Sequence, residues 1–210
     1  MRFLMTQSLL ALWKYQWSDF ERYGERAEEF QEKAENDFLS ALRREPIPTN
    51  EAMRKGIDFE RLVTDICFDK GDSSNDWYEA AREVAGDVKG GRFQLAAAKE
   101  VSVLGIDFLL YGKLDCLKAG VISDIKFSGS YSAGKFFDSP QHPMYMELVP
   151  EAREFTYIVS NGSKVWRETY RRDECCPVLS IIGEFVDYLR ETGLISLYKS
   201  FWKAKEKDKW

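Results

Sequence analysis

Histidine is almost missing from this sequence, and its scarcity excludes several kinds of catalytic site. His142 is the only histidine in a chain of 210 residues. A zinc site with two histidine ligands is therefore excluded, and a serine or cysteine catalytic triad would have to be built on His142. Functional side chains must be sought chiefly among other residue types.

Cysteine is also sparse and is not arranged to bind a metal. The four cysteines are Cys67, Cys116, Cys175 and Cys176, and none of them forms a C-x-x-C pair. Two adjacent cysteines make a poor metal clamp, and nothing in the sequence indicates secretion. We expect four reduced thiols in a cytoplasmic protein.

Long apolar runs are absent as well. The segment from Met1 to Trp17 is largely apolar, but polar residues interrupt it and no small-residue cleavage site follows, so it is not a convincing signal peptide. No run of about 20 apolar residues occurs, and a bilayer-spanning helix needs about that length. We therefore expect no membrane partner.

The composition is that of a folded, single-domain protein spanning residues 1–210. Hydrophobic residues make up 44% and charged residues 31%, which favours an ordinary globule over a disordered chain. The net charge of −5 argues against a uniformly basic surface for nucleic acid. It leaves room for a local basic groove, because the local field and not the sum of charges attracts a polyanion.

Helices are predicted for about residues 1–88. Residues 19–43 are rich in Glu, Lys, Ala and Arg, and Pro46 and Pro48 end that stretch because proline cannot continue a helix. Thr49 or Asn50 then caps a second helix, and residues 76–88 favour a third.

Strands are predicted for a sheet core at about residues 91–172. The expected strands are 93–98, 101–111, 114–117, 121–127, 154–160 and 164–170, with hairpin turns at 118–120 and at Asn161-Gly162. A short helix is expected at 143–148 inside this core, and C-terminal helices at 177–190 and 194–207, within about 177–208. This order predicts an α/β fold, in which helices flank a central mixed sheet.

Three short strings in the sheet core carry the functional prediction. They are Gly112-Lys113-Leu114-Asp115, Asp124-Ile125-Lys126 and Gln141-His142-Pro143-Met144-Tyr145. Alternate side chains of a strand share a face, so Asp124 and Lys126 lie together and Asp115 can point to the same side. Charge in an otherwise apolar strand is costly unless it is paired or bound to metal.

Two neighbouring carboxylates repel each other unless a cation lies between them. Mg²⁺ prefers oxygen ligands and keeps several waters, so two or three carboxylates and a substrate phosphate suffice to hold it. Such an ion lowers the pKa of a bound water and stabilises charge on an attacked phosphate. Lys126 would orient or deprotonate that water, or neutralise charge in the transition state.

In this order, the patterns G-x-x-D, D-x-K and Q-x-x-x-Y resemble the PD-(D/E)XK nuclease superfamily. More narrowly they resemble its RecB-type branch, which includes CRISPR-associated and phage-type exonucleases. The resemblance implies a restriction-endonuclease-like core and cleavage of DNA that depends on Mg²⁺ or Mn²⁺. The ordered correspondence covers residues 56–145, and the flanks match only in helical character.

The resemblance also implies roles for individual residues. Asp115 and Asp124 would bind the metal, with the carbonyl of Ile125 as a further oxygen ligand. Lys126 would be the catalytic lysine. Gln141 and Tyr145, one helical turn apart, would complete the site and contact substrate, although Pro143 between them is a departure from the pattern.

A further metal ligand is expected upstream, on a helix. Glu60 lies one turn after Gly56 and fits this position, where many relatives have histidine; Asp58 and Glu100 compete for the role. Some members of the branch carry a four-cysteine iron–sulfur cluster. The cysteines here do not match that layout, so we expect no cluster.

A second phosphate-binding pattern is a rival interpretation. Residues 129–136 nearly spell a P-loop, but that motif needs Ser or Thr after its lysine and here Phe136 follows Lys135. We therefore interpret Lys135 as a substrate-phosphate contact or a solvated loop residue, not as part of a nucleotide site.

The sequence thus predicts a Mg²⁺- or Mn²⁺-dependent deoxyribonuclease, and the resemblance favours an exonuclease. The alternative is a nuclease-fold subunit that binds DNA without cutting it, within a recombination or repair complex. The expected partner is DNA, and candidate protein partners are a recombinase, a single-strand-binding protein, a helicase or a second copy of the chain. Phage origin is suspected from the small size.

Overall fold

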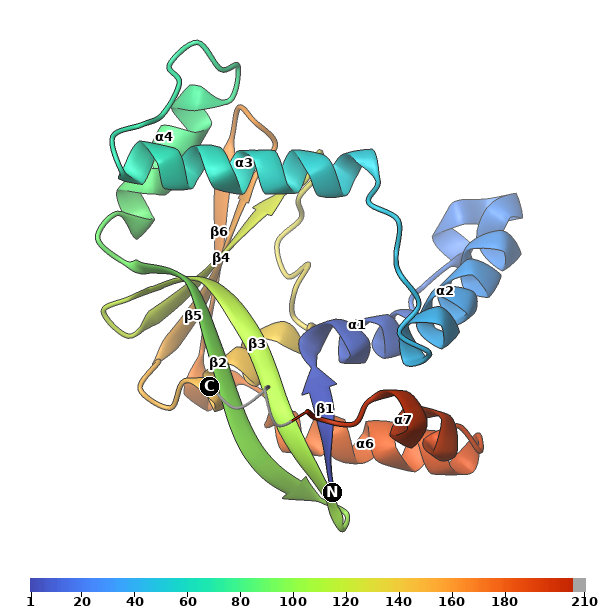
Figure 1. Cartoon of the computed structure of the whole chain (residues 1–210). Helices are drawn as coiled ribbons and strands as arrows, with labels where there is room; N and C mark the ends of the chain where they lie inside the picture. Colours follow the sequence, from blue (N-terminus) through green and yellow to red (C-terminus); the bar gives the residue numbers. More distant parts are fainter. Residues whose placement is uncertain (206–210) are drawn as a thin grey trace.

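The computed structural model describes residues 1–205, which form a mixed six-stranded sheet with helices on both faces (Figure 1). The strands are β1 (Arg2–Thr6), β2 (Arg92–Val103), β3 (Ile106–Lys118), β4 (Val121–Phe127), β5 (Glu154–Ser160) and β6 (Val165–Arg171). The helices are α1 (Gln7–Tyr15), α2 (Ala27–Leu42), α3 (Glu51–Cys67), α4 (Tyr78–Val88), α5 (Gln141–Leu148), α6 (Val178–Glu191) and α7 (Ile195–Phe201). Two short 3₁₀ helices, Glu21–Arg26 and Arg172–Glu174, join them. The predicted α/β class, with a mixed sheet flanked by helices, is confirmed.

Strand β3 organises the sheet because three other strands pair with it. The antiparallel strand β2 follows one edge of β3 along nearly its whole length. On the other edge, β1 pairs in parallel with residues 107–111, and β4 pairs antiparallel with residues 116–118. Strands β5 and β6 continue the sheet beyond β4. Residues 112–115 therefore lie at a fork between β1 and β4.

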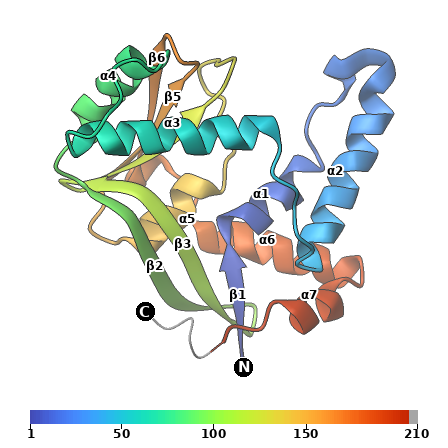
Figure 2. The same ribbon diagram turned by 45° about the horizontal axis from the view of Figure 1, so that its top comes forward.

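Two apolar clusters hold the helices against opposite faces of this sheet (Figure 2). Helices α3 and α4 pack on one face, where they cover Cys116, Ile125 and Ile158. Helices α1, α2, α5, α6 and α7 pack with the other face, in a cluster that includes Ile122 and Tyr157. Strand β4 therefore has helices on both sides.

The start of the chain differs from the sequence-based prediction. Residues 2–6 form strand β1, whereas the sequence predicted a wholly helical region up to about residue 88. The segment is short, with three consecutive apolar residues at 3–5, and periodicity does not separate a buried strand from a buried helix in such a run. Its parallel partner, residues 107–111, lies about a hundred residues later, so no local pattern indicates the pairing.

The predicted division of the first hairpin is also wrong. Strands β2 and β3 are each continuous and are joined by a turn at Leu104-Gly105, where the sequence predicted one strand over 101–111. Leu104 has a positive φ of 50°, which a leucine rarely adopts, so the turn has a weak sequence signature. The turn at Ala119-Gly120, the strand 154–160 and the cap at Asn50 agree with prediction.

Other features bear on the earlier expectations. The predicted C-terminal helix over 194–207 is shorter, since α7 ends at Phe201, and its last two residues lie outside the described part of the chain. All four cysteines are free thiols, with Cys67 and Cys116 buried. Within residues 1–205, no helix combines the length and apolarity that a bilayer crossing requires.

Candidate functional site

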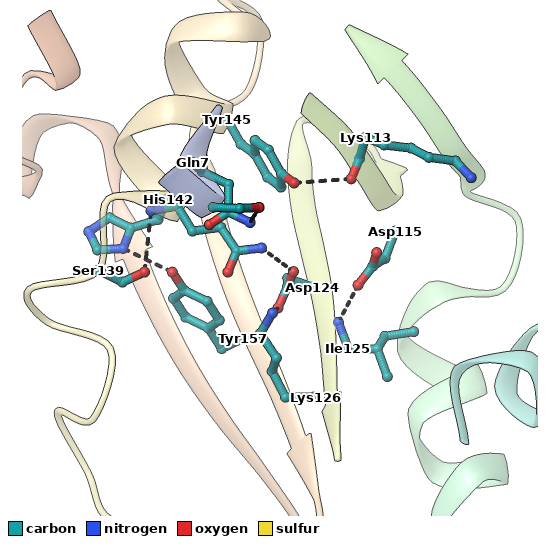
Figure 3. Close-up of polar contacts among 12 residues, drawn as sticks. Gln7, Lys113, Asp115, Asp124, Ile125, Lys126, Ser139, His142, Tyr145 and Tyr157 are labelled. Carbon is teal, nitrogen blue, oxygen red and sulfur yellow. Dashed lines mark hydrogen bonds and ion pairs between the residues drawn. The ribbon is translucent and has the colours of Figure 1, made fainter. Parts of the chain in front are cut away.

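The candidate site lies at the fork in the sheet, where the β3–β4 ladder stops. The last paired residues are Cys116 and Ser123, so Asp115 and Asp124 come next on the two diverging strands. The Oδ2 atom of Asp115 accepts a hydrogen bond from the backbone N–H of Ile125 at 2.8 Å, in place of a strand-to-strand bond (Figure 3). The fork therefore places the two carboxylates beside each other.

Asp124 is the most buried acid of the site, with 3% of its surface exposed. Its Oδ1 atom accepts a hydrogen bond from Nε2 of Gln141 at 2.5 Å, and its Oδ2 atom lies 2.8 Å from Nζ of Lys126 (Figure 3). Apart from that ion pair, no group in residues 1–205 donates a hydrogen bond to Oδ2, although the atom is buried. This buried oxygen is thus compensated by the ammonium group of Lys126, and a buried carboxylate of this kind is suited to interact with a cation.

Helix α5 brings the third string to the site. The helix begins at Gln141, two residues earlier than predicted, and Pro143 occupies its first turn, where a missing N–H costs little. Gln141 is thereby held beside Asp124, and the hydroxyl of Tyr145 donates a hydrogen bond to the carbonyl of Lys113 at 3.1 Å. The departure at Pro143 therefore does not displace Gln141.

Gly112 permits this close approach of α5 to the sheet. A Cβ atom at Gly112 would lie 2.4 Å from Cε1 of Tyr145 and 2.9 Å from Cδ1 of Leu148. No other residue type fits there unless the helix or the tyrosine moves. The glycine of the G-x-x-D string thus has a packing role one strand position from Lys113.

Glu60 faces the same carboxylates from helix α3. Burial raises the pKa of Glu60, the charge of Asp124 raises it further, and Lys113 and Lys126 oppose the shift. Nε2 of Gln94 donates a hydrogen bond to its Oε1 atom. Of the two rivals, Asp58 pairs with Arg61 on its own helix and Glu100 pairs with Arg2 at the other end of β2. The geometry favours Glu60.

The charges of the site are strongly interdependent. Burial raises the pKa of Asp115, and the negative charges of Asp124 and Glu60 raise it further. Burial by itself lowers the pKa of Lys126, but the three carboxylates outweigh this effect and hold the pKa above its usual value. Lys126 therefore carries a positive charge among three carboxylates, and this single charge does not balance theirs.

The donor set fits a hard divalent cation by its chemistry. The carboxylates of Asp115, Asp124 and Glu60 offer oxygen ligands. The carbonyl of Ile125, between Asp124 and Lys126 in strand β4, is a further oxygen. As the side chains stand, no group of three acidic, histidine or cysteine side chains in residues 1–205 is close enough to form a complete cage. Mg²⁺ requires only one or two carboxylates when water and phosphate supply the remaining oxygens.

Lys135 is the predicted site residue that the structure does not bring to the carboxylates. Its Nζ atom donates to Oγ of Ser128 at 3.2 Å and to the carbonyl of Ser130 at 3.3 Å, so the side chain folds back on its own loop. The P-loop interpretation also fails, because no helix follows Lys135 until α5 begins at Gln141. A P-loop places its lysine at the start of a helix.

Three residues near the site were missed in the sequence. Gln7 follows β1, which ends beside Tyr111, and in the close-up it lies next to Tyr145 (Figure 3). Gln94 stands opposite Asp115 with a positive φ of 53° and interrupts the β2–β3 ladder there. Strained backbone of this kind clusters at functional sites, but neither placement has a local sequence pattern. Lys113, which lies inside the first string, was quoted but given no role.

Comparisons with known proteins address the fold and not the activity. No protein-family model matches the chain, and no curated protein is similar in sequence. Among solved structures, the crystal structure of SSO0001 superposes with a TM-score of 0.54 and 12% sequence identity. The superposition covers 91% of this chain and 77% of that one. At this identity the likeness shows a shared fold alone.

Proposed function

We propose that this chain is a metal-dependent deoxyribonuclease, which hydrolyses phosphodiester bonds of DNA with Mg²⁺ or Mn²⁺. One observation carries the proposal above the others. The buried carboxylate of Asp124 has an ammonium group 2.8 Å from one oxygen and a second carboxylate, Asp115, on the neighbouring strand. Two acids and a lysine at a break in a sheet are suited to hold a cation and to act on a phosphate.

Each residue of the site has a proposed role in metal binding, catalysis or substrate binding. Asp115, Asp124 and Glu60, with the carbonyl of Ile125, would hold the ion. Once bound, a divalent cation supplies charge stabilisation at the phosphate and lowers the pKa of a coordinated water. Lys126 orients the attacking water and donates a hydrogen bond toward the phosphate oxygens. Gln141 and Tyr145 position the substrate on the α5 side of the site.

The likeness to the PD-(D/E)XK superfamily, and to its RecB-type branch, supports this assignment. The exonuclease preference within it rests on that resemblance alone. DNA is the substrate on the same ground. Candidate partners are a recombinase, a single-strand-binding protein, a helicase or a second copy of the chain, in a cytoplasmic setting without a membrane. Of these, a ring of copies or a helicase would supply processivity.

The proposal is tested by two substitutions at the site and two matched controls. Asp124→Asn removes the charge that binds the cation, and Lys126→Ala removes the ammonium group. Asp107→Asn and Lys164→Ala change the same residue types at exposed positions away from the fork. We expect the site variants to lose at least about 100-fold in the rate of DNA degradation with Mg²⁺ or Mn²⁺. Undiminished cleavage by either purified, folded site variant would refute the assignment.

One observation favours a second candidate, a nuclease-fold subunit that binds DNA without cutting it. Both oxygens of Asp124 already have partners within the chain, Gln141 and Lys126. Such a protein would bind DNA in the presence of EDTA and would show no hydrolysis with any divalent metal. Cleavage that depends on Asp124 and Lys126 would exclude it.

A further inference from the structure

A groove with a volume of about 710 Å³ lies beside the C-terminal end of helix α1. The α1 groove, as we call it, is lined on one side by Trp13, Lys14 and Trp17 and on the other by Lys135 and Ser139. Asp115, Asp124, Glu60 and Lys126, which form the proposed metal site and its catalytic lysine, are not among the residues that line the groove.

The groove presents a large, fixed aromatic surface to solvent. Trp17 is 58% exposed, yet its ring has near-perpendicular contacts with Trp13 and Tyr188, at interplanar angles of 81° and 88°. Tyr15, which also lines the groove, is 40% exposed. Exposed aromatic rings that are held in place provide stacking surfaces for unpaired bases at little entropic cost.

Two lysines border the groove without neutralising partners. Nζ of Lys14 donates to the carbonyl of Asp138 at 2.8 Å, and Nζ of Lys135 donates to Ser128 and Ser130. Within residues 1–205, neither ammonium group forms an ion pair with a carboxylate. Both ammonium groups are hydrogen-bonded to neutral oxygens only, so their charges attract phosphate.

The groove also carries three carboxylates, on Asp19, Asp138 and Glu184. This mixed charge disfavours an occupant that binds chiefly through a dense row of phosphates, as duplex DNA does. It suits a ligand that gains most of its affinity from stacking, with a few phosphate contacts. A single strand has that character, because its base faces are unpaired and accessible.

The groove wall directly precedes the candidate active-site helix in the sequence. Oγ of Ser139, on the groove wall, accepts a hydrogen bond from the backbone N–H of Gln141 at 3.2 Å. The side chain of Gln141 in turn contacts Asp124. Pro140, which also lines the groove, is thus the residue immediately before the one whose side chain contacts Asp124.

We propose that the α1 groove binds single-stranded DNA, with a base stacked on Trp17 and phosphates near Lys14 and Lys135, and guides the strand to Asp124. The inference deepens the proposed nuclease function, since it names an unpaired strand as the substrate. Binding in the groove needs no metal, so it is measured separately from cleavage.

Binding is measured in EDTA by the fluorescence anisotropy of an end-labelled oligothymidylate strand and of a blunt duplex. For Trp17→Ala, we expect the dissociation constant for the single strand to rise by about 5- to 150-fold, the factor that one stacked base supplies. Trp17→Phe retains a ring and should restore most of the affinity. Lys14→Ala should weaken binding and lower the slope of log K against log salt by about 0.7.

The matched control is Phe201→Ala, which removes an aromatic ring of 46% exposure outside the groove and should leave the affinity unchanged. Equal weakening by Phe201→Ala, no effect of Trp17→Ala, or equal loss of duplex binding would overturn the proposal. Single-strand binding through Trp17 without any cleavage in Mg²⁺ would uphold the groove and refute the nuclease. Cleavage that depends on Asp124 but not on Trp17 would do the reverse.

Discussion

Substitution of Gly112 by alanine tests whether the packing of α5 against the sheet positions the site. The added methyl would stand 2.4 Å from Cε1 and 3.0 Å from Cδ1 of Tyr145, and 2.9 Å from Cδ1 of Leu148. Carbon atoms in contact prefer separations of about 3.5 to 4.0 Å, so the tyrosine ring or the whole helix must shift by roughly 1 Å. Tyr145 is 5% exposed and has no open side to which it could turn without cost.

The magnitude follows from the cost of overpacking a core. Extra methyl groups in well-packed sites cost about 1 to 3 kcal/mol. For a domain of this size, each kcal/mol corresponds to about 2 to 4 °C in Tm, so we expect Gly112→Ala to lower Tm by about 2 to 12 °C. Because Tyr145 and Gln141 are on the same helix, DNA cleavage should fall by more than stability alone explains, by about 10- to 100-fold.

Urea denaturation and the cleavage rate at a temperature where both proteins are folded are the assays. Gly86→Ala is the control, since Gly86 lies inside helix α4 with no atom within 4 Å of an added Cβ, and alanine there should stabilise by about 0.5 to 1 kcal/mol. Adding Tyr145→Leu to Gly112→Ala should recover part of the stability but not the activity. Unchanged stability in Gly112→Ala would refute the packing argument.

Two further predictions concern acid and metal. His142 is 4% exposed, and its burial lowers its pKa to about 4 from 6.5, although Glu168 favours the charged form and Lys14 opposes it. As pH falls from about 6.5 to 4, His142 is protonated in the unfolded chain before it is protonated in the folded protein. The wild type should therefore lose up to about 3 kcal/mol of its free energy of unfolding over this range, and His142→Phe should not. Parallel profiles of urea midpoint against pH for the two proteins would contradict this. Mg²⁺ at about 100 times its dissociation constant should raise Tm by about 5 to 10 °C, because it relieves repulsion between the acids of the site. A thermal scan of Asp124→Asn should show almost no rise in Tm. An equal rise in this variant would place the ion elsewhere.

Local patterns predicted much of the sheet core and of the candidate site. Alternation along residues 121–127 and the turn at 118–120 were enough to place Asp124 and Lys126 on one strand next to Asp115. The prediction of Glu60 came from the resemblance to the RecB-type branch, applied to the spacing between Gly56 and Glu60. Each of these inferences depends on residues close together in the sequence, where strand and helix periodicity apply directly.

The parts that sequence reasoning missed depend on distant pairing or on unusual backbone. Strand β1 forms only because residues 107–111 offer it an edge, and Gln7 reaches the site only because β1 ends there. Leu104 and Gln94 adopt positive φ angles, which neither residue type predicts. In both cases tertiary context determined a conformation that local propensity disfavours.

The most direct test of the central claim is anomalous diffraction from crystals of this protein soaked in Mn²⁺. The account predicts a manganese peak within bonding distance of carboxylate oxygens from both Asp115 and Asp124, with Glu60 bound directly or through water and Nζ of Lys126 close to the same waters. Manganese peaks confined to other surface acids, with Asp124 still bound only by Gln141 and Lys126, would contradict it.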